Sequence, residues 1–158
     1  MDSDILRRAK LRAIHLLEYR DRTEKDMRRK LQQGDYPPEV IDKTIEYLKS
    51  YGYIDDKRYA GRYLSMRLGG KGRRRLFMEL QQKGVDPSLA QEAWMEICQE
   101  EDINERAAIR RLIEKKVGER TRLPRKEHQR LLNYLARRGF SWEDISAELE
   151  ENGIEPEG

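Results

Sequence analysis

The sequence predicts an all-α protein made of three tandem three-helix repeats. Apolar residues recur at the three- and four-residue spacing of amphipathic helices along most of the chain. No segment alternates β-branched and polar residues as a half-buried strand does, so we expect no β-sheet. A leucine, a short and mostly polar run and a glycine occur together three times, and the three leucines are 49 and then 55 residues apart. Internal similarity at that period is typical of repeat architectures.

The first repeat is predicted over residues 1–54. Its first helix carries apolar residues from Ile5 to Leu17, and its third helix carries them from Val40 to Leu48. Thr23 is expected to cap the second helix, because its hydroxyl can accept a backbone amide and Asp26 follows three residues later.

The second repeat is predicted over residues 55–101, and the third over residues 102–158, which end in an acidic tail. Proline is tolerated in a first helical turn because the amide that it lacks has no partner there. Pro87 and Pro124 therefore indicate helix starts, and Ser141 is a second capping residue.

The three repeated segments are Leu31–Gly34, Leu80–Gly84 and Leu135–Gly139. Each glycine is expected to end its helix in the left-handed conformation, which glycine adopts without a steric cost. A lone three-helix unit has little core, so neighbouring repeats are expected to stack on one another. Charged residues make up 40% of the chain, against about 25% in average proteins. Because so much charge needs surface, we expect an elongated body.

Composition excludes several classes of protein. No apolar run approaches the roughly 20 residues of a membrane-spanning helix, and the acidic start of the chain lacks the basic region of a signal peptide. Cys98 is the single cysteine, which excludes an intrachain disulfide and suits a reducing cytoplasm. His15 and His128 are too far apart in the sequence to suggest a zinc site.

The case for catalysis is weak. Asp55 and Asp56 are adjacent carboxylates, but they precede an expected helix and are better explained as capping residues than as magnesium ligands. Cys98 has acidic neighbours, which make a thiol a poor nucleophile. The Gly69–Gly72 segment has neither the spacing nor the Ser/Thr of a phosphate-binding P-loop. We therefore expect that the protein is not an enzyme and that it binds neither a cofactor nor a metal.

Charge is segregated along the chain although the net charge is only +3. Residues 62–75 contain basic residues and no acid, and residues 106–138 contain twelve basic residues and three acids. Residues 141–158 contain seven acids and no base. A local basic field favours a polyanionic partner, and a mosaic surface of mixed charges is the alternative.

One basic cluster is the best candidate for binding an external anion. The Gly69–Gly72 turn leads into a helix with Arg73, Arg74 and Arg75 in its first turn. Arginine opposes the helix dipole there, and neither Arg73 nor Arg74 has an acid at helical spacing. The backbone amides of a helix N-terminus would attract the same anion.

A comparable cluster at Arg28–Lys30 is expected to be neutralised within its own helix. Glu24 lies four residues before Arg28, and Asp26 lies four residues before Lys30, so two of the three basic charges have a partner at helical spacing. This cluster is therefore the weaker candidate.

Four tyrosines lie around the first junction between repeats: Tyr51, Tyr53, Tyr59 and Tyr63. Tyrosine rings can stack on nucleic-acid bases, but at helical spacing they more often fill the seam between repeats. We expect Tyr59 to be packed in this way, and Tyr63 is left open between the two roles.

These residues resemble a known family. The segment Tyr51–Leu64 (YGYIDDKRYAGRYL) and the basic glycine-rich turn that follows it resemble the bacterial RecX family. The segments Ala13–Leu31 and Leu80–Gly84 resemble it too, so that the similarity runs from about residue 9 to residue 152. The third repeat is less diagnostic, and Gln33-Gly34 stands where the family often has Lys-Gly.

The resemblance implies a non-enzymatic modulator of the RecA recombinase with a curved, elongated body. Family members lie in the groove of the RecA filament on single-stranded DNA, and they inhibit its ATPase, strand exchange and co-protease activities. A cytoplasmic monomer that acts in DNA repair, homologous recombination and the SOS response is expected, in contact with DNA directly or through RecA. Contacts to the filament or nucleic acid are expected at Arg29, Arg67, Lys71, Arg73, Arg74, Arg75, Arg137 and Arg138.

Two alternatives remain: a helical nucleic-acid-binding module and a protein-only helical-repeat adaptor. Against the first, the third helix of each repeat is acidic or mixed in charge, whereas a helix that enters a DNA groove should be basic. A salt titration separates the two, because binding to DNA weakens steeply with salt.

Overall fold

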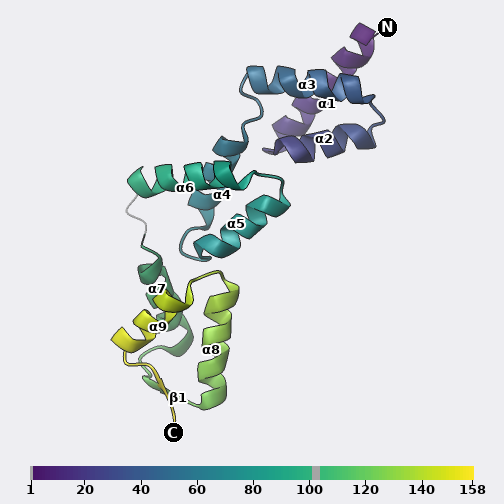
Figure 1. Cartoon of the computed structure of the whole chain (residues 1–158). Helices are drawn as coiled ribbons and strands as arrows, with labels where there is room; N and C mark the ends of the chain where they lie inside the picture. Colours follow the sequence, from purple (N-terminus) through teal and green to yellow (C-terminus); the bar gives the residue numbers. More distant parts are fainter. Residues whose placement is uncertain (1, 101–103) are drawn as a thin grey trace. The chain divides into compact units, whose positions relative to one another are not determined.

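The computed structural model describes residues 2–100 and 104–158 (Figure 1). Over these ranges the chain forms nine α-helices in three successive groups of three, which confirms the predicted all-α repeat fold. The chain divides into two compact units, one with residues up to Tyr63 together with Leu80–Trp94, the other with Leu64–Glu79 together with the chain from Met95. The predicted boundary between residues 101 and 102 lies outside the described residues. The boundary after residue 54 and the elongated, curved shape stay predictions.

The first compact unit contains the helices of the first repeat: α1 (Asp2–Tyr19), α2 (Glu24–Gln33) and α3 (Pro38–Ser50). Helix α1 packs along α3, and α2 packs against both. As predicted, the Thr23 hydroxyl caps α2 by accepting the amide of Asp26 at 3.1 Å. The core between the helices is apolar and buried, and it consists of Ala13, Leu16, Met27, Leu31, Ile41, Ile45, Leu48 and Ile54.

The prediction that a glycine in the left-handed conformation ends α2 is wrong. Gly34 has a φ of −84°, and the left-handed residue is Asp35, with a φ of 61°. Gly84 and Gly139 do adopt the predicted conformation, with φ values of 97° and 95°. Both glycines stand four residues after their leucine, whereas Gly34 stands three after Leu31, so Asp35 occupies the equivalent position.

The middle repeat consists of α4 (Asp56–Arg67), α5 (Arg73–Gln82) and α6 (Pro87–Glu100), and each of these helices contributes residues to both compact units. The start of α6 at Pro87 agrees with the prediction. The expected capping role of Asp55 is also confirmed, because its carboxylate accepts the amide of Arg58 at 3.1 Å.

The second compact unit contains the third repeat: α7 (Glu105–Val117), α8 (Arg125–Arg137) and α9 (Trp142–Glu151). As predicted, Ser141 caps α9 by accepting the amide of Asp144 at 3.1 Å. The buried core of this repeat consists of Ala108, Ile109, Ile113, Val117, Leu123, Leu131, Leu135, Phe140, Ile145, Leu149 and Ile154.

The expected absence of strand pairing is wrong in the third repeat. Strand β1 (Arg122–Leu123) pairs in parallel with strand β2 (Glu155–Pro156). Two residues are too few to show an alternating pattern in the sequence. Leu123 is buried and precedes a proline, which favours extended backbone, and the buried side chain of Ile154 anchors the other strand.

Candidate anion-binding site

The Gly69–Gly72 turn between α4 and α5 packs against the turn after α8, and both turns belong to the second compact unit. The amide of Gly72 donates to the carbonyl of Arg138 at 2.7 Å. In return, the Arg138 guanidinium donates to the carbonyl of Gly70. A Cβ on Gly72 would lie 2.5 Å from the carbonyl oxygen of Gly139, so only glycine allows this approach.

Gly139 lets the first turn of α5 approach the turn after α8 just as closely. A Cβ on Gly139 would lie 2.4 Å from the Cβ of Arg75, and the positive φ of Gly139 is itself unfavourable for other residues. The fold therefore gathers the basic residues at the start of α5 and Arg138 at the end of α8, which are more than 60 residues apart in the chain. We refer to Lys71, Arg73, Arg74, Arg75, Arg111 and Arg138 as the basic cluster.

Arg74 is the most available of the three arginines in α5. Its side chain is exposed and makes no ion pair with a described residue. Arg73 is more engaged, because its guanidinium lies over the ring of Phe77, 4.3 Å from the centroid. No acid lies at helical spacing from Arg73, but packing brings a distant one, since the backbone amide of Arg73 donates to the Glu105 carboxylate at 2.6 Å.

Glu105 occupies the start of α5, where the sequence pattern predicts an external anion. Burial raises the pKa of the Glu105 carboxyl above its ordinary value, and the hydrogen bond from the amide of Arg73 and the charge of Arg73 oppose that shift. The amide of Arg73 is therefore not available to a ligand. An incoming anion would be bound through the arginine side chains.

Glu79 neutralises part of the basic cluster from within α5. Its carboxylate accepts from Lys71 Nζ at 2.7 Å and from Arg75 Nε at 2.9 Å. The Glu79 side chain is only 12% exposed, so this carboxylate lies beneath the two cations. Lys71 and Arg75 consequently offer less net charge to a ligand than Arg74 does.

Arg111 belongs to the basic cluster although it was not among the site residues predicted from the sequence. One of its guanidinium nitrogens lies 3.2 Å from the position that a Cβ on Gly69 would occupy. Arg111 is exposed and makes no ion pair with the part of the chain that the structure describes. No sequence signal connects it to Gly69, because the two residues are joined only by the packing of α7.

Three predicted site residues are not part of the basic cluster as defined above: Arg67, Arg137 and Arg29. Arg67 is half-buried and Arg137 is exposed in the same compact unit as the basic cluster. Arg29 lies in the other unit, where its guanidinium donates to Asp26 at 2.7 Å.

The expected pairing of Lys30 with Asp26 is wrong. Besides Arg29, the Asp26 carboxylate accepts from Arg22 at 2.8 Å. The expected pair of Arg28 with Glu24 is present, at 3.1 Å. Two of the three charges at Arg28–Lys30 are thus paired, as the sequence indicates, but the second is that of Arg29.

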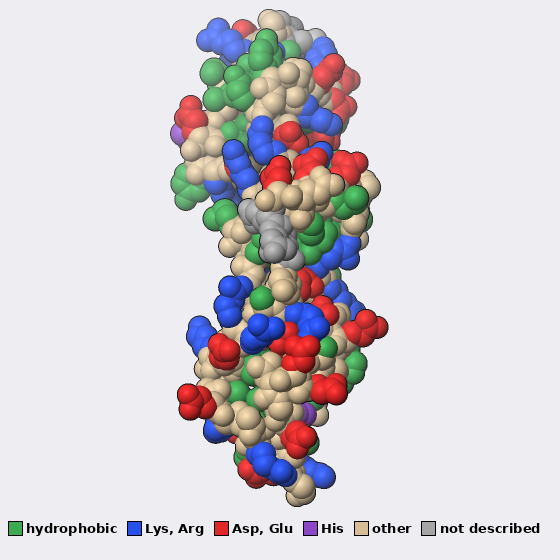
Figure 2. Space-filling view, turned by 90° about the vertical axis from the view of Figure 1, so that its left-hand side faces the viewer, with side chains coloured by type: hydrophobic (Ala, Val, Ile, Leu, Met, Phe, Trp, Pro, Cys, Tyr) green, Lys and Arg blue, Asp and Glu red, His purple; other side chains and the backbone are tan. Residues whose placement is uncertain are grey.

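Charge is less segregated in the fold than along the sequence. Glu148 comes from the acidic tail and is buried, and it accepts from Arg106 Nε at 3.1 Å and from Arg110 Nη2 at 3.2 Å. Burial alone would raise the pKa of Glu148, but the two arginines hold it below the ordinary value. On the face that Figure 2 shows, basic and acidic side chains are interspersed. The tail therefore cancels part of the positive charge of α7.

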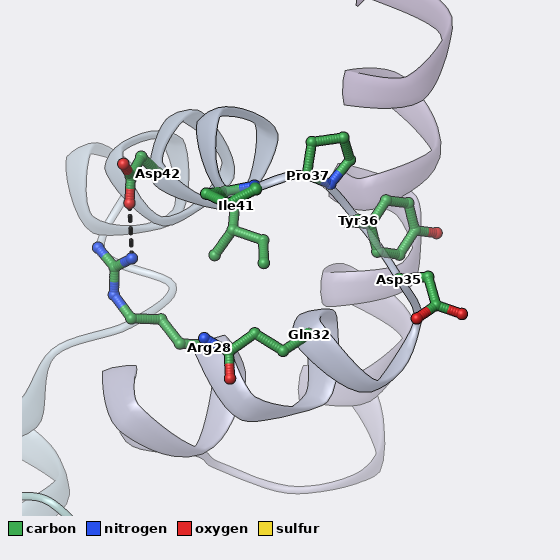
Figure 3. Close-up of a pocket in the computed structure, with 8 residues that line it drawn as sticks. Arg28, Gln32, Asp35, Tyr36, Pro37, Ile41 and Asp42 are labelled. Atoms are coloured by element: carbon green, nitrogen blue, oxygen red, sulfur yellow. Dashed lines mark hydrogen bonds and ion pairs between the residues drawn. The ribbon is translucent and has the colours of Figure 1, made fainter.

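A hollow lies between α2 and α3 of the first repeat (Figure 3). Tyr36, Pro37 and Ile41 provide apolar surface in it, and the left-handed Asp35 lines its rim. Arg28, the cation that lines it, donates to Asp42 at 2.7 Å and to Glu24 at 3.1 Å. With that cation doubly paired, the hollow is a weaker anion site than the basic cluster.

Two further functions find no support among the described residues. No group of three His, Cys, Asp or Glu side chains in residues 2–100 and 104–158 is placed to hold a metal ion. Within the same residues, no helix combines the length and the apolar character needed to cross a membrane.

Comparisons with known proteins identify the repeats. Three models of the RecX family match in order: the first three-helix domain over residues 9–48, the second over residues 55–93 and the third over residues 104–149.

Relatives named regulatory protein RecX are similar over most of the chain. The protein from Clostridium acetobutylicum is 32% identical over 90% of this chain and 68% of its own length. That from Bacillus velezensis is 36% identical over 96% of this chain, which spans only 58% of that relative. The relative from Shigella boydii is 34% identical over 85% of both chains.

Two crystal structures have the same fold. RecX from Lactobacillus salivarius superposes with a TM-score of 0.83 and 24% identity, over 97% of this chain and 99% of that one. A second structure, described as regulatory protein RecX, superposes with a TM-score of 0.80 and 25% identity, over 94% of this chain and 74% of that one.

Proposed function

Because this chain belongs to the RecX family, we propose that it is a non-enzymatic negative regulator of the RecA recombinase. It binds in the groove of the RecA filament on single-stranded DNA and inhibits the ATPase, strand exchange and co-protease activities of RecA. It acts in the cytoplasm as a monomer, in homologous recombination, DNA repair and the SOS response.

The observation that carries the proposal is the basic cluster, assembled from two repeats around a glycine turn. Arg74 and Arg111 are exposed and unpaired among the described residues, and Arg138 is held at the same turn by its bond to Gly70. Gly69 and Gly70 have no side chains, so an anionic group can approach the backbone of the turn closely at these two residues.

The chemistry of the cluster suits phosphate or carboxylate oxygens. A guanidinium offers a planar fork of donors that matches either group with two parallel hydrogen bonds. Phosphates of the single-stranded DNA in the filament and carboxylates on the surface of RecA are thus both compatible partners. The cluster requires no bond-breaking chemistry, which agrees with a role by binding alone.

The test is RecA-driven ATP hydrolysis on single-stranded DNA, with increasing amounts of this protein. We expect hydrolysis to fall at ratios well below one molecule per RecA, because a bound regulator stops a filament that contains many subunits. Unchanged hydrolysis with the protein in excess would overturn the proposal. If DNA binding persisted in that case, the chain would be a helical nucleic-acid-binding module instead.

The basic cluster is tested in the same assay with Arg74→Ala plus Arg111→Ala. We expect this variant to need a higher concentration for half-maximal inhibition. Arg28→Ala plus Arg29→Ala is the matched control, since it removes the same charge from residues that already have carboxylate partners. Equal weakening by both variants would show a general effect of charge rather than a site.

A further inference from the structure

Three tyrosines form a cluster at the end of α3 in the first repeat. The rings of Tyr47 and Tyr51 are 4.9 Å apart between centroids, and those of Tyr51 and Tyr53 are 5.9 Å apart and nearly parallel, at 15°. Tyr51 and Tyr53 are 65% and 45% exposed. Two large rings thus stack on each other in solvent. They do not fill the core.

The other two tyrosines of the junction behave differently. Tyr63 is buried, and its ring stacks on that of Tyr59 at 6.2 Å between centroids. This pair has the packing role that the sequence predicts for Tyr59, and it resolves the open question about Tyr63 in favour of packing. The exposure of Tyr51 and Tyr53 is therefore not a general property of the tyrosines near this junction.

The backbone holds the exposed pair in a fixed position. Gly52 has a φ of 72°, and its amide donates to the carbonyl of Lys49 at 3.0 Å. The amide of Tyr53 donates to the carbonyl of Leu48 at 2.8 Å, which completes a Schellman turn. Ile54 is buried directly after it. The two rings are therefore fixed by a hydrogen-bonded turn and by a core anchor.

A basic residue of α1 lies over one ring of the tyrosine cluster, and a second lies one helical turn away from it. Lys10 Nζ stands 4.3 Å from the ring centroid of Tyr47, and Arg7 lies one turn earlier on the same side of the helix. Arg7 is exposed and has no ion pair with the described part of the chain. Between Asp4 and Glu18, α1 has four Lys or Arg residues and no acid. Asp55, which follows Tyr53 by two residues, accepts the amide of Arg58.

We propose that Tyr51 and Tyr53 are a stacking platform for the bases of single-stranded nucleic acid, with Lys10 and Arg7 binding its phosphates. Every base has a flat π-face, and aromatic side chains beside cations are how proteins hold single strands without reading sequence. Because the two rings already contact each other, a base adds to the stack on an outer ring face. The platform belongs to the first repeat and is independent of RecA, so it goes beyond the proposed function.

The experiment measures binding in the absence of RecA, by fluorescence anisotropy at low salt. The probes are an oligothymidylate of about 20 nucleotides, longer than a typical single-strand site, and an abasic oligonucleotide with the same number of phosphates. Because base stacking requires bases, we expect the wild-type protein to bind the oligothymidylate about tenfold more tightly than the abasic chain.

Variants then assign the effect to the two rings. Tyr51→Leu plus Tyr53→Leu should weaken oligothymidylate binding about tenfold and leave abasic binding unchanged. Tyr51→Phe plus Tyr53→Phe keeps the rings and should bind like the wild type. Tyr19→Leu is the matched control, because Tyr19 is 83% exposed and lies outside the cluster.

Equal binding of both probes by the wild-type protein would overturn the platform without the need for any variant. Unchanged oligothymidylate binding by the Leu double variant would overturn it too. If that variant kept DNA binding but lost inhibition of RecA, the tyrosines would instead contact a protein. A protein that binds the two probes as expected, yet does not inhibit RecA, would retain the platform and lose the proposed function.

Discussion

The backbone amide of Arg73 donates to the carboxylate of Glu105 at 2.6 Å, which joins the start of α5 to the start of α7. The same bond occurs one repeat earlier, where the amide of Glu24 donates to Asp56 at 2.9 Å. Both donors and both acceptors are 49 residues apart. Each bond satisfies an amide that the helix itself cannot satisfy. A carboxylate that caps the middle helix of the preceding repeat is therefore a repeated feature of the chain.

The glycine after the middle helix completes each junction. At Gly84 an added Cβ would lie 2.4 Å from the Cβ of Lys25, and at Gly139 it would lie 2.4 Å from the Cβ of Arg75. The equivalent position of the first repeat holds Asp35. We infer that glycine is needed where a preceding repeat packs on the turn.

Replacing Gly139 with alanine is expected to destabilise the third repeat by about 2 kcal/mol or more. The left-handed backbone costs roughly 1–2 kcal/mol for an L-residue, and the contact with Arg75 adds to that cost. Urea denaturation followed by circular dichroism measures the loss. Gly153→Ala is the control, because Gly153 also has a positive φ but no atom lies within 4 Å of its Cβ position. Equal losses for the two variants would mean that the junction is not tightly packed.

Asp35→Gly should raise the stability of the first repeat. Glycine removes the left-handed strain of Asp35, although it gains entropy in the unfolded chain, so we expect a net gain of about 0.5–1 kcal/mol. For a chain of this size, that corresponds to a rise in melting temperature of roughly 1–4 °C. A lower melting temperature would show that the Asp35 side chain makes a stabilising contact.

The salt dependence of DNA binding should distinguish phosphate contacts at the basic cluster from general attraction by the positive charges of the protein. For binding to single-stranded DNA, each lost phosphate contact flattens the slope of log K against log salt by roughly 0.7. We expect Arg74→Ala plus Arg111→Ala to flatten it by up to twice that amount, with an unchanged melting temperature. Arg28→Ala plus Arg29→Ala should change it less. An unaltered slope for the first variant would show that the two arginines do not contact phosphate.

Glu148 should make the stability of the third repeat depend on pH. Its pKa is lower in the folded protein than the ordinary value of 4.5. A lowered carboxyl pKa stabilises the fold above the unfolded-state pKa, and that stabilisation is lost as the pH falls through the folded-state pKa. Glu148→Gln should therefore cost about 1.5–3 kcal/mol at pH 7, the range for hydrogen bonds to charged groups.

Urea denaturation of wild type and Glu148→Gln at several pH values measures this effect. The difference between the two proteins should shrink as the pH falls below 4.5, because the unfolded wild-type chain then binds a proton at Glu148 more readily than the folded protein does. It should reach its minimum below the folded-state pKa, where the carboxyl is protonated in both states. A difference that stays constant with pH would mean that the charge of Glu148 contributes nothing and that only its packing matters.

Features that depend on neighbours in the chain could be predicted from the sequence alone. Apolar spacing specified the helices, because a helix brings residues three and four apart to one face. Thr23 and Ser141 identified two helix starts, since a cap acts on an amide three residues away. The recurring leucine and glycine identified three repeats. The strand pair at β1 and β2 was missed because two residues carry no period.

Which charges are available to a partner depends on packing between distant parts of the chain. Arg73 and Arg74 are equivalent in the sequence, but packing gives Arg73 the carboxylate of Glu105, 32 residues away, and leaves Arg74 exposed. Packing likewise brings Arg111 beside Gly69 and buries Glu148 under two arginines. Helical spacing shows only partners within about one turn. The site depends on contacts between residues tens of positions apart, whose meeting is determined by how the helices pack.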